Sequence, residues 1–84
     1  MFRVANDLPH LGLAARDLLI VEQRGNAATG ELVIARLHER VFIGRWWAKR
    51  GSRALLDSAF HVIVEAPELV VFGAVTLIAR DETR

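Results

Sequence analysis

The residues that decide the fold are two consecutive apolar stretches, residues 31–38 (ELVIARLH) and residues 40–47 (RVFIGRWW). Both are rich in β-branched, aromatic and leucine side chains, and such runs are typical of strands. Only Glu39 lies between them. The two stretches are therefore predicted to form a β-hairpin that bends at Glu39.

Outward from this hairpin, the chain alternates between short apolar runs and segments with turn chemistry. The turns are predicted at residues 23–30 (QRGNAATG), 49–53 (KRGSR) and 66–68 (APE). Further strands are predicted at residues 2–4, 17–22, 54–57, 60–65 and 69–78. A helix over residues 9–19 is the alternative for that segment, and Gly12 weakens it. Short strands divided by frequent turns predict an all-β fold, a small and partly open barrel or sandwich.

Length and composition restrict the classes of function. The 84 residues predict a single domain, residues 1–84, with little room for a deep pocket. Cysteine is absent, which excludes disulfides, thiolate metal sites and thiol nucleophiles. The formal net charge of +1 is too small to indicate a nucleic-acid-binding protein from its field alone. No cofactor is predicted.

The longest apolar run covers residues 69–79, about half of the roughly 20 residues that a membrane-spanning helix needs. The first residues, MFRV, lack the basic head and apolar stretch of a signal peptide. We therefore expect a cytoplasmic protein without membrane contact.

Five segments in order resemble one known family: residues 17–21 (DLLIV), 30–35 (GELVIA), 40–43 (RVFI), 58–63 (SAFHVI) and 71–75 (VFGAV). They are similar to strands of the carboxy-terminal domain shared by LexA-type repressors and UmuD-type mutagenesis proteins. The fourth and fifth segments are closest to the UmuD branch. The resemblance extends over about residues 2–80, and it implies the small, mainly β fold of that domain.

The same resemblance implies self-cleavage by a serine nucleophile and a neutral lysine base. The nucleophile position falls at Asp7 and the lysine position at Gly44. Arg45 cannot act as the base, because a guanidinium does not deprotonate in proteins. Lys49, the only lysine in the chain, comes five residues too late. The chain is therefore predicted to be a pseudoprotease with no catalytic residue.

The first strand begins almost directly after Met1, and no Ala-Gly or Cys-Gly pair occurs. The chain is therefore expected to lack the family's amino-terminal DNA-binding domain and cleavage segment, like processed UmuD. The resemblance implies a homodimer that acts in the SOS response to DNA damage. It further implies three kinds of partner, namely a translesion DNA polymerase, the RecA filament, or a full-length UmuD or LexA relative.

The last predicted strand, residues 69–78, lacks alternation between apolar and polar residues. That pattern predicts burial on both faces, and in so small a protein a second copy is the expected cover for one of them. The candidate residues for this dimer interface are Val70, Val71, Phe72, Val75 and Leu77.

An alternative function is the binding of single-stranded nucleic acid, which uses aromatic side chains beside cations. The candidate residues are Arg45, Trp46, Trp47, Lys49, Arg50 and Arg53. Successive side chains of a strand point to opposite faces, so at most one of the two tryptophans can stack on a ligand. The competing interpretation, which we favour, is one core tryptophan, one interface tryptophan and a solvated basic turn.

Two weaker interpretations concern polar residues. A residual peptidase would need Ser52 or Ser58 as nucleophile, and neither has a base at a suitable spacing. A metal site is not expected, because His10, His38 and His61 lie on separate segments without paired spacing. Asp7, which precedes Pro9, is expected to be a solvated turn residue.

Overall fold

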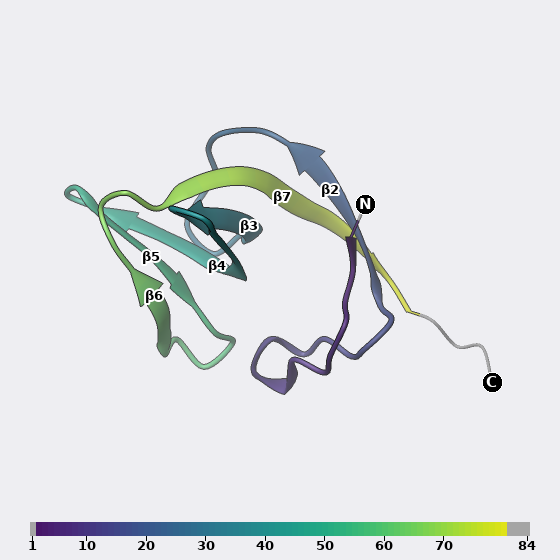
Figure 1. Cartoon of the computed structure of the whole chain (residues 1–84). Coiled ribbons are helices and arrows are strands. Elements are labelled where there is room, and N and C mark those ends of the chain that lie inside the picture. The colour runs from purple at the N-terminus through teal and green to yellow at the C-terminus, as the bar shows by residue number, and fades with distance from the viewer. Residues whose placement is uncertain (1, 81–84) are drawn as a thin grey trace.

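A computed structural model describes residues 2–80 of the chain. These residues form one antiparallel sheet in the order β1-β2-β7-β3-β4-β5-β6 (Figure 1). The strands are β1 (Phe2–Arg3), β2 (Leu18–Gln23), β3 (Leu32–Leu37), β4 (Arg40–Lys49), β5 (Ser52–Leu56), β6 (Val62–Glu65) and β7 (Val70–Ala79). The sheet curls into a half-barrel, which confirms the predicted all-β, partly open architecture.

Two tight hairpins organise the centre of the sheet. β3 and β4 pair from Leu37–Arg40 to Leu32–Arg45, so the predicted bend at Glu39 is confirmed. The turn between β4 and β5 is shorter than the predicted turn, residues 49–53, because the two strands remain paired as far as Lys49 and Ser52. Its two central residues, Arg50 and Gly51, have φ of 50° and 83°. Positive φ at both positions matches the twist of the flanking strands.

The segment between β1 and β2 is a loop with one 3-10 turn, Pro9–Leu11. The turn ends at Gly12, whose φ of 70° is one that glycine adopts at little cost. The helical alternative for residues 9–19 is therefore wrong. Residues 2–80 contain no helix with the length and hydrophobicity needed to cross a membrane.

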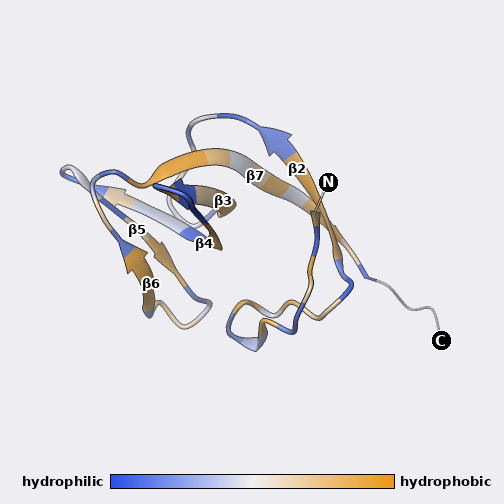
Figure 2. Cartoon of the chain, viewed as in Figure 1, coloured by the Kyte–Doolittle hydropathy of each residue, from blue (hydrophilic) through white to orange (hydrophobic). Residues whose placement is uncertain are grey.

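Both faces of the sheet carry buried clusters. One cluster lies over β3, β4, β5 and β7 and consists of Val33, Ala35, Trp46, Leu55, Leu69, Val71 and Ala74. The other lies where the 4–13 segment covers the curled sheet and consists of Val4, Leu11, Leu13, Leu19 and Leu32. Figure 2 shows apolar strands in the sheet joined by mostly hydrophilic turns. The curl thus buries side chains on both sides of one sheet.

β7 lies inside the sheet, where β2 and β3 pair with its two edges, and β4 is equally long at ten residues. The single chain does not bury both faces of β7, because Val70, Phe72 and Leu77 are exposed. The reason is that the loops cover only part of the curled sheet. Cover of one face by a second copy stays a prediction.

Candidate functional site

Asp7, to which the resemblance assigns the position of the nucleophile, has a structural role. Asp7 is exposed, and its Oδ1 accepts a hydrogen bond from the Ala15 amide at 2.8 Å. This bond closes the loop between β1 and β2. The prediction that Asp7 is a solvated turn residue is confirmed.

Gly44, to which the resemblance assigns the position of the lysine base, is closely packed. A Cβ atom on Gly44 would lie 3.0 Å from Leu55 Cβ, 3.1 Å from Ile63 Cδ1 and 3.2 Å from the Leu56 carbonyl oxygen. Such contacts with backbone and with a neighbouring Cβ leave no space for a side chain. Gly44 therefore permits the close approach of β4 to β5, and a lysine does not fit there.

The remaining polar candidates lie apart from one another. Ser52 begins β5 at the hairpin turn, and Ser58 lies in the turn before β6, where its amide donates to the His10 carbonyl at 2.9 Å. Neither hydroxyl takes part in a hydrogen bond within residues 2–80. His38 lies 3.9 Å from Glu68 and His61 lies 3.3 Å from Asp57. Across the same residues, no three metal-ligating side chains gather at one place.

The five candidates on β7 divide among different environments. Val71 is only 3% exposed and belongs to the core, so it is not available to a partner. Val75 packs against the cluster under the 4–13 segment. Leu77 is exposed, but it neighbours Ile78, which packs inward, and so it points away from that core. Val70 and Phe72, two residues apart, share the remaining exposed side.

Val70 and Phe72 belong to a larger surface that we call the apolar face: Phe2, Val41, Val70 and Phe72. All four side chains are exposed. The Phe2 and Phe72 ring centroids are 6.2 Å apart. Val70 and Val41 lie on either side of Arg36 in the register of β7, β3 and β4.

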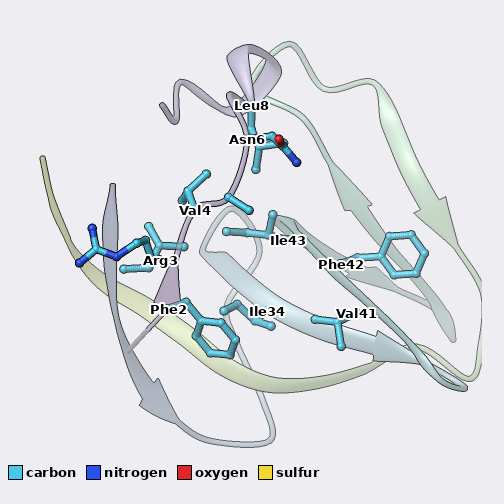
Figure 3. A pocket seen from close by; sticks show the side chains of 11 residues that line it. Phe2, Arg3, Val4, Asn6, Leu8, Ile34, Val41, Phe42 and Ile43 are labelled. Atoms are coloured by element: carbon cyan, nitrogen blue, oxygen red, sulfur yellow. The ribbon is translucent and has the colours of Figure 1, made fainter. Parts of the chain in front are cut away.

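A groove of about 250 Å³ adjoins the apolar face (Figure 3). Phe2, Ile34 and Val41 line one side of it, and Val4, Leu8 and Ile43 line the other. The Phe42 ring points away from this groove. The Arg40 guanidinium lies over the Phe42 ring, 5.3 Å from its centroid. The lining is mainly apolar, so the groove suits hydrophobic side chains of a partner.

The basic segment at the end of β4 divides between the two faces of the sheet. Trp46 is 7% exposed and lies in the core, whereas Trp47 is 40% exposed. The prediction that the tryptophans point to opposite faces is therefore confirmed. Arg53 lies on the Trp46 side, where its Nη1 donates to the Leu69 carbonyl at 3.1 Å. Arg45 and Lys49 alternate with Trp46 on the strand and share the side of Trp47.

Trp47 and Phe60 line a second cavity, which we call the aromatic hollow, of about 280 Å³. Arg45 lines it too, and its Nη1 donates to the Gly30 carbonyl at 3.4 Å. Phe60 is 77% exposed and has a φ of 67°. A bulky residue with positive φ is uncommon and costs conformational energy.

The Asp57 carboxylate fixes the turn that carries Phe60. Its Oδ1 accepts from the His61 amide at 2.9 Å and from the Ala59 amide at 2.8 Å. These amides, that of His61 foremost, hold the pKa of Asp57 below its ordinary value. The Phe60 amide donates to the Asp57 carbonyl at 3.1 Å. The exposed ring therefore stands on a well-defined turn.

Sequence reasoning missed two residues of these surfaces, Phe60 and Phe2, and one buried carboxylate, Asp17. The sequence pattern places Phe60 in a strand, whereas it lies in the turn before β6. The predicted strand that contains Phe2, residues 2–4, is too short to indicate which of its side chains are exposed. Asp17 is buried at the start of β2, where its Oδ2 accepts from the Ala14 amide and from Arg80 Nη1. Asp17 comes directly before the apolar run LLIV. A carboxylate at the start of a buried strand needs hydrogen-bond donors, so this position could have indicated a buried and hydrogen-bonded aspartate.

Comparison with known protein families finds no family model that matches this chain, and no curated protein matches it.

Proposed function

We propose that this chain is a non-catalytic interaction domain that pairs with a second copy of itself through the apolar face. The observation that carries the proposal is the gathering of Phe2, Val41, Val70 and Phe72 on one side of the sheet, all exposed, beside an apolar groove. Exposed apolar side chains grouped around one arginine, here Arg36, are typical of protein–protein contacts.

The two positions of the implied catalytic dyad support a role without catalysis. Asp7 is engaged by the Ala15 amide, and Gly44 is in contact distance of β5 and β6. A serine–lysine mechanism needs a hydroxyl within hydrogen-bond reach of a lysine amine. Neither group stands at these positions.

The resemblance to UmuD-type proteins supplies the wider context of the proposal. In that context the dimer works in the SOS response and docks on a translesion DNA polymerase, a RecA filament or a full-length UmuD or LexA relative. An affinity pull-down from the native host after DNA damage tests this part. Recovery of one of these proteins supports the context, and their absence from the captured material contradicts it.

The dimer is tested by sedimentation velocity of the wild type and of Val70→Lys. We expect a dimer for the wild type, with at least about 30-fold weaker association for the variant, because a lysine charge would be buried at the contact. Val62→Lys is the matched control, since Val62 is similarly exposed but lies on β6, outside the apolar face.

Two results would contradict the proposed dimer. One is a wild type that stays monomeric up to about 100 μM, an affinity too weak for a specific pair. The other is equal loss of association in Val70→Lys and Val62→Lys. Circular dichroism of all three proteins separates weakened pairing from a failure to fold.

A further inference from the structure

We infer that the aromatic hollow binds a short segment of single-stranded nucleic acid, with Trp47 and Phe60 stacking on bases and Arg45 and Lys49 contacting phosphates. The inference does not depend on the dimer, because Trp47, Phe60, Arg45 and Lys49 lie outside the apolar face.

Arg45, Trp47 and Lys49 occupy every second position of β4. Their side chains therefore project from the same side of the strand at steps of about 6.8 Å. Directly opposite Trp47 on β5 lies the buried Ala54, and the Trp47 side chain beside it remains 40% exposed. One strand thus presents cation, aromatic ring and cation in a row.

Phe60 supplies a second ring to the same hollow. Its ring and that of Trp47 line one cavity, but within residues 2–80 they do not form an aromatic pair with each other. A planar base can therefore lie against either ring or between them. Exposing a phenylalanine and holding it at positive φ are both unfavourable, and strained residues of this kind cluster at binding sites.

The charges around the hollow favour a polyanion. Arg45, Lys49 and Arg50 lie at this end of β4 and its turn. The acids nearby are Glu31, whose carboxylate is paired with Arg24, and Asp57, whose carboxylate is engaged by the Ala59 and His61 amides. Glu65 lies beyond Ala54 on β6. Cations beside uncovered rings are the combination that binds single strands irrespective of sequence.

The test is tryptophan fluorescence on adding an oligothymidine of about twelve nucleotides at low salt. The variant Trp46→Phe leaves Trp47 as the only fluorophore. We expect quenching in this variant and a slope of log K against log salt of about −1.4 to −2.1 for two to three phosphate contacts. Oligouridine of the same length, added in parallel, distinguishes DNA from RNA as the source of the strand.

Substitutions then assign the binding to the hollow. Each of Trp47→Ala and Phe60→Ala is expected to weaken binding about 5- to 150-fold, the range for loss of one stacked base. Lys49→Ala is expected to reduce the salt slope by about 0.7. Arg36→Ala removes the same charge between Val41 and Val70, away from the hollow, and serves as the control with unchanged binding. Trp47→Phe keeps a ring and should retain most of the affinity.

Three outcomes would overturn the inference. They are absence of quenching at low salt, equal binding by Trp47→Ala and the wild type in an assay with labelled oligonucleotide, and competition by polyglutamate as effective as that by oligothymidine. The last result would show that charge alone is recognised. If the wild type dimerises but fails these tests, the nucleic-acid inference is overturned and the proposed dimer is not. If the wild type is monomeric but passes them, the proposed dimer is overturned and the nucleic-acid inference is not.

Discussion

The apolar face and the aromatic hollow lie at opposite ends of β4, on the same side of the strand, and they differ in chemistry. Val41 belongs to the first and Trp47 to the second. The apolar face near Val41 consists of two valines and two phenylalanines, with the exposed Arg36 between Val41 and Val70. Around Trp47 the side chains are aromatic rings interleaved with cations.

This difference is the physical basis for proposing two kinds of partner on one strand. Aliphatic surface gains free energy by being covered with other aliphatic surface, whatever the charge of the partner. Rings between cations favour a ligand that is planar and negatively charged. Gly44 lies between Val41 and Trp47 on β4 and permits the close approach of β4 to β5. A side chain at this position would therefore disturb both regions.

The largest expected effect is that of Gly44→Lys, which should damage both regions together. The new Cβ would meet Leu55 Cβ at 3.0 Å and the Leu56 carbonyl at 3.2 Å. We expect a loss of about 3 kcal/mol or more in the free energy of unfolding, measured by urea denaturation. Gly25→Lys is the control, because a Cβ there meets no atom within 4 Å. A fully stable Gly44→Lys protein would contradict the packing described for β4.

The next effect separates the two regions. Val70→Lys is expected to weaken self-association at least about 30-fold and to leave oligothymidine binding unchanged. Trp47→Ala is expected to do the opposite, with binding weakened about 5- to 150-fold and pairing intact. Sedimentation and fluorescence titration of both variants measure this. If either variant impairs both properties while remaining folded, the two regions form one surface and the comparison fails.

A smaller effect concerns pH and the turn beneath Phe60. The amides of His61 and Ala59 lower the pKa of Asp57 in the folded chain. A lowered folded pKa stabilises the fold above the unfolded pKa of about 3.9, and this contribution disappears as pH falls through the folded value. Asp57→Asn is therefore expected to be less stable than the wild type at neutral pH. The difference should narrow on acidification, which urea denaturation between about pH 3 and pH 7 can follow.

Glu39→Gln is the control for this pH effect. It removes the same charge from the turn between β3 and β4 and so reports the effect of net charge alone. Parallel stability curves for Asp57→Asn and the wild type would show that the carboxylate does not hold the turn.

The smallest effect is expected for the two serines. Ser52→Ala and Ser58→Ala should each change the free energy of unfolding by less than about 0.5 kcal/mol, since neither hydroxyl is hydrogen-bonded within residues 2–80. A serine-reactive phosphonate should not label the wild type. Labelling that is lost in either variant would establish a peptidase and contradict the non-catalytic proposal.

Most of the fold could be predicted because it depends on local patterns. The hairpin at Glu39 follows from two apolar runs separated by one residue, and opposite orientations of Trp46 and Trp47 follow from strand geometry. The site was harder to predict, because it depends on which residues the turns bring together. Phe60 joins Trp47 only through the turn that Asp57 holds, and Phe2 meets Phe72 only across β2 and β7.

The sequence by itself determined the all-β class, the strand and turn positions around the central hairpin, and the absence of cysteine chemistry. These properties depend on residue type and on period-two spacing, which are local. Only the tertiary structure decided that Val71 is core while Val70 is surface, that Gly44 admits no side chain, and that β7 lies inside the sheet between β2 and β3. The reason is physical: burial depends on which strands become neighbours and on how the sheet curls, and both are set by contacts between residues far apart in the chain.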